Sequence, residues 1–502
     1  MPLHLLSLPN EILRLICLET ENLLTEREAA AAAGPGPGPI FSDREDANPV
    51  SIGPHPYTLK SVSAACRALR GAARPVLFAK TRCYPGQYSA FACMLLDQPD
   101  LASAIKSVHW PSGGMAGFSR AQRQRGDDDP SDRRDYDRVL PLILELFYSI
   151  PENNNSNPGS SSSKSWLSTA QIWLHLSLLP NLEDALLSVP LAGHVMYTRR
   201  DLTFPSLKRI GRPFELGTPY NLRRPSTDIL TLGSTAHRAP LLEEIHATAS
   251  LFAGDVNPPG LRLPSVTTLS LVGFAALDGL RLELVLSTAP GLRKLGLWQA
   301  RRPEFVSRVT PRQVCAAILA GAPGLEELEL GLVGDADSGR LDRGGEPTPA
   351  AELRMRFSGL VRLRKLKFLG GTNVYGRGRA VAQAHGGLGG QHGGGEGSLA
   401  GTGTVSDLDQ RHYYQVDWKD WLPASIEELH IEAHPGFGLV RLAELAPRFF
   451  PALKRVTVKK VAMQRGRWPL VEEDGDDGLL DGAQGALDKA GVKLRVIPAA
   501  AR

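Results

Sequence analysis

A short phrase with the form Pro-x-Leu-x-x-Leu recurs along most of this 502-residue chain. Seven copies carry the proline, with other apolar residues replacing leucine in some, and they begin at Pro205, Pro240, Pro264, Pro290, Pro323, Pro423 and Pro451. A weak copy begins at Pro180, and a copy without proline begins at Arg362. Pro240, Pro264 and Pro290 are 24 and 26 residues apart. This period indicates a repeat protein, in which each repeat buries its apolar side against its neighbours.

Each repeat is expected to contain one short strand, because Leu-x-Leu places two side chains on one face of a strand. The second apolar residue is present as Leu271, Leu297, Leu330, Phe368, Ile431 and Val458. Helices predicted over 280–289 and 314–322 lie between strands. The pattern resembles leucine-rich repeats and implies an α/β solenoid with a parallel sheet and outer helices. The position that is often Asn or Cys in that family holds Phe274, Ala300, Val333, Gly371, His434 and Val461. Since no asparagine ladder can form, we expect an irregular solenoid.

Two stretches ahead of the repeats are predicted to be short amphipathic helices. Residues 8–16 read Leu-Pro-Asn-Glu-Ile-Leu-Arg-Leu-Ile, with apolar residues spaced by four. Residues 59–70 carry an apolar stripe at helical spacing and are followed by Arg-Pro-Val-Leu-Phe at 74–78. Neither stretch is large enough to fold alone.

The order of these motifs resembles an F-box: Leu-Pro-x-Glu-Ile, then Leu-x-x-Val-x-x-x-Cys-Arg, then Pro-x-Leu-Phe. Members of that family use this small all-α module to dock on the Skp-type adaptor of SCF ubiquitin ligases. The resemblance implies that the adaptor-binding or helix-pairing residues are Leu8, Pro9, Ile12, Ile16, Leu59, Val62, Cys66 and Leu69. The alternative is a helical hairpin that caps the first coil of the solenoid.

These patterns divide the chain into an F-box at 1–80 and a solenoid at 81–500. Ala-, Gly- and Pro-rich sequence at about 26–55 is expected to be a disordered insertion in the F-box, where the family has a shorter connection. Flexible insertions in the solenoid are expected at about 112–137, 152–164 and 370–410. The sequence also predicts one helix over 87–101, a strand over 105–110, a loop over 120–138 and a helix over 139–150.

Residues that flank the buried leucines are expected to point onto the concave face that repeat proteins use for binding. These are Arg209 and Gly211; Glu244 and His246; Thr268, Ser270 and Val272; Lys294, Gly296 and Trp298; Glu327, Glu329 and Gly331; Lys365, Lys367 and Leu369; Glu428, His430 and Glu432; Arg455, Thr457 and Lys459. The later repeats alternate between basic and acidic.

Two interpretations of this face remain open. Opposite charges on neighbouring strands can pair with each other, or the face can bind a partner of mixed charge. For the second interpretation the candidate partner-binding residues are His246, Trp298, Lys365, Lys367 and His430. An exposed Trp298 would be a binding hot spot, or it could stack on Arg301 or Arg302.

Composition narrows the class of protein. The formal net charge of +4 comes from 57 basic and 53 acidic residues without a concentrated basic patch, so nucleic-acid binding is not predicted. The cysteines, Cys17, Cys66, Cys83, Cys93 and Cys315, form no Cys-x-x-Cys pair and are expected to be reduced. No apolar run reaches about 18 residues, so no membrane contact is predicted.

The Gly-rich and acidic stretches lack the motifs that would indicate catalysis. Residues 370–403 contain no phosphate-binding loop, and the chain contains no Gly-x-Ser-x-Gly. Asp335, Asp337 and Glu346 have the spacing of calcium ligands, but Arg340 occupies the position that needs glycine. We therefore predict no catalytic residue, metal site or cofactor.

The sequence-based expectation is a cytoplasmic or nuclear F-box subunit of an SCF-type ubiquitin ligase that binds an unknown protein substrate through its repeats. The alternative is a repeat scaffold that acts outside a ubiquitin ligase.

Overall fold

The computed structural model describes residues 78–83, 87–110, 130–146, 161–187, 202–211, 238–248, 262–273, 278–298, 309, 311–331, 356–369, 418–433, 438–460 and 476–497. They form two compact units, which divide after residue 248, with residues 262–266 belonging to the first unit and residues from 267 onward to the second. Residues 1–77, which carry nearly all of the predicted F-box, lie outside the described residues.

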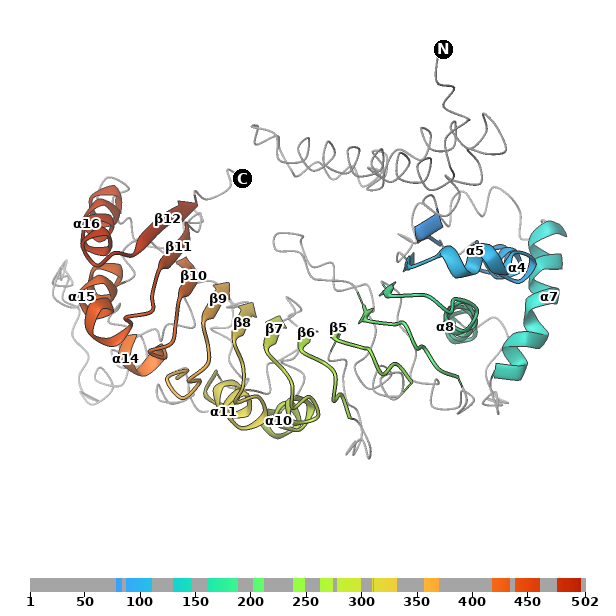
Figure 1. The fold of residues 1–502 in the computed structure, drawn as a ribbon, viewed down its shortest axis with the longest axis horizontal. Coiled ribbons are helices and arrows are strands. Elements are labelled where there is room, and N and C mark those ends of the chain that lie inside the picture. Colours follow the sequence, from blue (N-terminus) through green and yellow to red (C-terminus); the bar gives the residue numbers. More distant parts are fainter. Residues whose placement is uncertain are drawn as a thin grey trace, which may run out of the picture. The chain divides into compact units, whose positions relative to one another are not determined.

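In the first unit, five parallel strands are described, and each pairs with the next along the chain. The strands are β1 (Lys80–Arg82), β2 (Ser107–Trp110), β3 (Asp184–Leu187), β4 (Arg209–Ile210) and β5 (Glu244–Thr248). The helices are α4 (Tyr88–Asp97), α5 (Pro99–Ala104), α7 (Pro130–Leu146) and α8 (Ser161–Leu178) (Figure 1). The weak repeat copy at Pro180 is therefore a true repeat, because β3 follows it.

In the second unit, seven parallel strands are described, again in sequence order. They are β6 (Thr268–Val272), β7 (Lys294–Trp298), β8 (Glu327–Gly331), β9 (Lys365–Leu369), β10 (Glu428–Ala433), β11 (Arg455–Lys460) and β12 (Lys493–Ile497). Its helices are α10 (Gly279–Ser287), α11 (Pro311–Gly321), α14 (Trp418–Trp421), α15 (Leu439–Phe449) and α16 (Asp476–Lys489). These helices lie on one side of the strands (Figure 1). Parallel strands added one per repeat, with helices between them, make the α/β solenoid-like fold that the repeat predicts.

The recurring Pro-x-Leu sequence builds the tight turn that precedes each strand. The amide of Leu292 donates to the carbonyl of Ala289 at 3.0 Å, and Leu325 makes the same bond to Ala322 at 3.2 Å. Proline stands at the second position of both turns, where its fixed φ is preorganised and its missing N–H is not needed. The same hydrogen bond, from an amide to the carbonyl three residues earlier, is donated by Leu182, Leu207, Leu242, Val266, Leu363, Ile426 and Leu453.

After most of these turns, two successive amides donate to one carbonyl of the preceding repeat. Glu326 and Glu327 both donate to the carbonyl of Arg293, at 2.8 and 2.9 Å. The carbonyl of Glu326 in turn accepts from the two residues that follow Leu363. This backbone ladder fixes the register of neighbouring repeats. Within each unit, a strand that is joined in this way therefore begins at the same level as the strand before it.

The core of the second unit lies between the strands and the helices. Leu295, Leu328 and Leu366 are each at most 2% exposed and face one another across neighbouring strands. The second apolar residue of each repeat forms a parallel row of buried side chains: Leu297, Leu330, Phe368, Ile431 and Val458. These two rows are the inward positions that the Leu-x-Leu pattern predicts.

Three sequence-based boundaries are wrong in the first unit. The single helix predicted over 87–101 is divided into α4 and α5, because Pro99 begins a new helix after the break at Gln98. The predicted loop over 120–138 is shorter, since α7 already begins at Pro130. The insertion predicted at 152–164 overlaps α8, which begins at Ser161.

An ion pair with α4 and a buried apolar side explain why α7 includes residues that look like a polar loop. Arg138 forms two hydrogen bonds to the carboxylate of Asp97 on α4, at 3.0 and 2.5 Å. Val139 and Ile143, further along α7, are fully buried. The mixed-charge sequence is therefore the polar side of a helix whose apolar side packs on the unit.

A buried histidine connects a helix of the first unit to its sheet. The indole N–H of Trp110, on β2, donates to Nδ1 of His175 at 3.2 Å. Nε2 of His175, on α8, lies 2.8 Å from the carbonyl of Tyr88 on α4, so with that tautomer it donates there. The imidazole is fully buried, and burial lowers its pKa to about 4. His175 is therefore a neutral structural residue near pH 7.

We predict that acidification destabilises the first unit through His175. In the unfolded chain the imidazole has its usual pKa of about 6.5, so the unfolded state binds the proton first as the pH falls. Stability is therefore lost below about pH 6.5, and the loss reaches about 3 kcal/mol near the folded-state pKa. Urea unfolding followed by hydrogen exchange of α8 measures it. His175→Gln, which keeps a donor and an acceptor, should remove about 2 kcal/mol of the difference between about pH 7.5 and about pH 5. An unchanged pH dependence in that variant would contradict the assignment.

Candidate binding face of the repeat sheet

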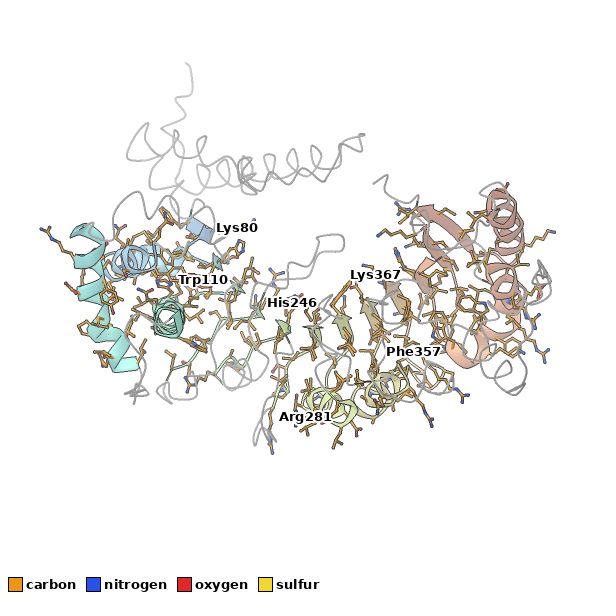
Figure 2. The ribbon with its side chains drawn as sticks, turned by 180° about the vertical axis from the view of Figure 1, so that it is seen from behind. Lys80, Trp110, His246, Arg281, Phe357 and Lys367 are labelled. Atoms are coloured by element: carbon orange, nitrogen blue, oxygen red, sulfur yellow. The ribbon has the colours of Figure 1, made fainter. Side chains whose placement is uncertain are left out.

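The second unit has a sheet face that is turned away from its helices. This is the side that the sequence predicts to be the concave face, and it bears Lys294, Glu327 and Lys365. We call it the outer face because it is turned away from the helices and the core. These residues alternate along their strands with buried leucines, so their side chains point away from the core. Figure 2 shows Lys367 on the outer face and Phe357, which is fully buried, on the opposite side of the strands.

Charges alternate in sign along the first row of this face. Strand register aligns Lys294, Glu327, Lys365, Glu428 and Arg455 as successive neighbours. The carboxylate of Glu327 lies 3.3 Å from the ammonium of Lys294 and 3.2 Å from that of Lys365. On the next pair of strands Arg455 lies 3.4 Å from Glu428.

The second row of the outer face contains one close ion pair. Lys367 lies 2.5 Å from Glu329, and both side chains are about one-third exposed (30% and 32%). Their neighbours in the row are Gly296 on one side and His430 on the other. This pair is therefore flanked by no permanently charged neighbour in its own row.

A third row of alternating charge lies just before the strands, at the level of the backbone ladder. It comprises Arg293, Glu326, Arg364, Glu427 and Lys454. Glu427 accepts hydrogen bonds from Arg364 on one side and from Lys454, at 2.9 Å, on the other. These two bonds, that of Arg364 first, lower the pKa of the Glu427 carboxyl to about 2. Glu427 therefore stays ionised throughout the physiological range.

The first unit has the same arrangement. Glu183 pairs with Lys106 at 3.1 Å and with Lys208 at 2.8 Å, and these contacts lower the pKa of its carboxyl. Asp184 accepts two hydrogen bonds from Arg209, at 2.5 and 2.6 Å. Both units therefore use alternating charge between successive repeats.

In each repeat two adjacent residues carry the same charge. The sequence analysis identified the second residue of each such doublet and missed the first. The signal is present in the sequence, because the two residues between the repeat leucines carry the same sign: Arg293-Lys294, Glu326-Glu327, Arg364-Lys365, Glu427-Glu428 and Lys454-Arg455. Only the second residue of each doublet belongs to the Leu-x-Leu strand alternation. The first residue escaped notice because it precedes the strand.

These contacts place the two candidate lysines in internal ion pairs. Lys365 is half-exposed but paired with Glu327, and Lys367 is paired with Glu329. This is the pairing that the self-stabilising interpretation requires. His430 lies between Lys367 and Thr457 in the second row.

The other two candidates are not accessible. His246 is 7% exposed, and its Nε2 lies 2.7 Å from the carboxylate of Glu244. It also sits against Gly211, whose φ of +91° and closeness to the His246 carbonyl leave no room for a side chain there. The structure brings this histidine into the wall of the first unit rather than onto an open surface.

The prediction of an exposed Trp298 is wrong, because its side chain is 5% exposed. Its six-membered ring lies over Gly331 of the neighbouring strand, and its indole nitrogen is near Gly296. The two glycines leave the space that the ring fills. Arg301 and Arg302, the proposed stacking partners, lie outside the described residues.

The structure does not describe the predicted adaptor-binding residues. They are Leu8, Pro9, Ile12, Ile16, Leu59, Val62, Cys66 and Leu69, and all of them lie outside the described residues. The predicted insertion at about 370–410 lies outside them as well.

The three cysteines that the structure describes lie inside the two units. Cys83, Cys93 and Cys315 are buried and not disulfide-bonded, and burial raises the pKa of the Cys83 and Cys315 thiols to about 12. Within the described ranges, no group of His, Cys, Asp or Glu side chains is placed to hold a metal ion. None of the helices described combines the length and apolar character needed to cross a bilayer.

Comparison with known proteins adds no identity to this geometry. No protein-family model and no curated protein matches the chain.

We predict that the Glu329–Lys367 pair stabilises the second unit through its charges. Glu329→Lys places two ammonium groups side by side and should lower the free energy of unfolding by about 1 kcal/mol. The double variant Glu329→Lys/Lys367→Glu restores opposite charges and should recover most of the loss. Urea unfolding followed by hydrogen exchange of β8 and β9 measures both. Equal instability of the single and double variants would show that the pairing contributes nothing.

A second prediction concerns the seat of Trp298. A methyl group at Gly331 would stand 2.2 Å from the indole ring, so Gly331→Ala should destabilise the unit by about 1–3 kcal/mol. Gly324→Ala is the matched control, because the nearest atom to its added methyl is 4.0 Å away. Thermal unfolding of the two variants makes the comparison. Similar melting temperatures would contradict the packing described.

Proposed function

We propose that this chain is the substrate-recognition subunit of an SCF-type ubiquitin ligase. An N-terminal F-box would dock on a Skp-type adaptor, and the repeat units would hold a target protein. The chain itself makes no covalent bond in this proposal. It acts by raising the effective concentration of a target lysine near the ubiquitin carrier.

The observation that carries the proposal is the junction between the F-box-like motif and the repeats. The motif ends in Pro-Val-Leu-Phe at 75–78, and β1 begins two residues later at Lys80. The carbonyl of Phe78 accepts a hydrogen bond from the hydroxyl of Thr81, at 2.9 Å. The last residue of the motif is thus joined to the first strand of a repeat sheet. A short junction of this kind suits a receptor that must hold its target at a defined distance from the adaptor.

The repeat architecture supports the receptor half of the proposal. A sheet whose strands start at one level offers an extended surface made of many short, similar segments. A structural role for the charges does not exclude binding, because the paired side chains of the outer face remain one-third to one-half exposed. The second candidate function is a repeat scaffold that acts outside a ubiquitin ligase. It is favoured by the internal pairing of the lysines that were candidates for binding.

We predict that the full chain binds a purified Skp-type adaptor directly. The double variant Leu8→Ala/Pro9→Ala should weaken binding at least about thirty-fold, since truncation of central interface residues costs about 2 kcal/mol. Isothermal titration calorimetry measures the dissociation constants.

Arg14→Ala is the matched control for that experiment. It lies in the same short segment but off the stripe formed by Leu8, Ile12 and Ile16, so its affinity should stay within about threefold of the wild type. A folded wild-type chain that does not bind the adaptor supports the scaffold function instead. Equal binding by the double variant and the control contradicts the F-box assignment.

A further inference from the structure

The last strand of the second unit, β12, has a neighbour on one side only among the described residues. It pairs with β11 in parallel register, and the hydrogen-bonded strand order ends with it. Figure 1 shows β12 at the end of the strand row, beside α16. One edge of β12 therefore presents backbone N–H and C=O groups that could accept another strand.

The core positions of β12 are incompletely covered. Val496 is 37% exposed, whereas its register partner Val458 on β11 is fully buried. Leu494 is also partly exposed, whereas its partner Val456 is fully buried. The apolar layer between strands and helices thus remains accessible at this end.

The alternation of charge stops at the same place. Arg455 is paired with Glu428 on its inner side, but its register partner on β12 is Lys493, a second base. Lys493 and Arg495 are exposed, and in the part of the chain that the structure describes neither forms an ion pair with a carboxylate. Each base of β9, by contrast, lies against a carboxylate of β8.

The sequence of β12 shows which neighbour would complete it. Residues 493–496 read Lys-Leu-Arg-Val, which has the same alternation as Lys-Leu-Lys-Phe at 365–368 in β9. β9 lies between two strands that begin Glu-Leu, and β8 reads Glu-Leu-Glu-Leu at 327–330. The same chain therefore contains a template for the strand that fits beside such a sequence.

We propose that the edge of β12 that has no neighbour among the described residues is a docking site for an extended segment of a partner protein in which acidic and apolar residues alternate. The segment adds as a further strand. Its acidic side chains pair with Lys493 and Arg495 on the outer face. Its apolar side chains cover Leu494 and Val496 on the core side. Backbone hydrogen bonds supply affinity, and the alternation supplies specificity.

A second copy of this chain is a poorer occupant of the edge. Two β12 strands placed side by side would bring lysine and arginine against lysine and arginine, and like charges on paired strands repel. The proposal does not depend on the F-box, so its failure would leave the proposed function untouched.

The test uses the full chain and a fluorophore-labelled peptide with three consecutive Glu-Leu units. Fluorescence polarisation measures affinity, and hydrogen exchange locates binding. The peptide should bind and protect the amides of β12. Two control peptides should bind at least about tenfold more weakly. One has the same composition in the order Glu-Glu-Glu-Leu-Leu-Leu. The other has N-methylated glutamates, because the amides of the outward-facing charged residues are the ones that donate to the preceding strand in this sheet.

Variants of the protein separate local from general electrostatics. Lys493→Glu/Arg495→Glu should weaken binding of the alternating peptide at least about tenfold. Arg262→Glu/Arg362→Glu, at exposed positions outside β11, α16 and β12, makes the same change in net charge and should bind as the wild type does. Equal binding of the shuffled or N-methylated peptide would overturn the proposal, as would the absence of protection at β12. Concentration-dependent self-association that protects β12 would assign the edge to a second copy and overturn the partner proposed here.

Discussion

The backbone ladder at the start of each strand is the constraint on which the rest of the structure depends. In most of the described repeats, two amides donate to one carbonyl of the repeat before it, as Lys454 and Arg455 do to Glu427. Within each unit, this geometry fixes both the register and the level of the strands that it joins. Once the level is fixed, Leu-x-Leu side chains must meet in rows, and polar residues between them must also meet in rows. A charged residue placed in one repeat therefore determines which charge is tolerated in the next.

Alternating sign is the solution that this chain uses. A row of like charges about 4.8 Å apart would repel along its whole length, whereas alternating rows pair each acid with a base on both sides. Glu427, between Arg364 and Lys454, is the clearest case, because its two partners hold the pKa of its carboxyl near 2. Because each charge is paired with an opposite charge of the same chain, the outer face carries little net charge along these rows. A partner that contacts this face meets a surface of paired charges, so shape and backbone edges contribute more to recognition than net charge does.

Much of this fold could be predicted from the sequence because the same pattern of proline and apolar residues recurs in each repeat. Leu295 or Leu328 alone would say little, but seven prolines followed by the same apolar spacing define strands, turns and core rows together. What escaped prediction depends on contacts without a period. The burial of Trp298 rests on Gly331 of another strand, and α7 extends over a polar tract because Arg138 reaches Asp97. Neither partner could be paired from the sequence. The same limit applies to the candidate binding face. The alternation along a strand predicts which way a side chain points, but not whether a neighbouring residue covers it, as happens for Trp298.

The charges of a strand in a repeat sheet also indicate the kind of strand that fits beside it. Inside the sheet, β9 is bounded by two neighbours, β8 and β10, whose charges complement its own. The sequence of a strand therefore records the character of both neighbours. β12 has the composition of a strand with an acidic neighbour on each side, yet Arg455 and Thr457 on β11 supply no acid to Lys493 and Arg495. In the docking proposed for this edge, the acidic complement to these two bases comes from the side of β12 that has no neighbour among the described residues.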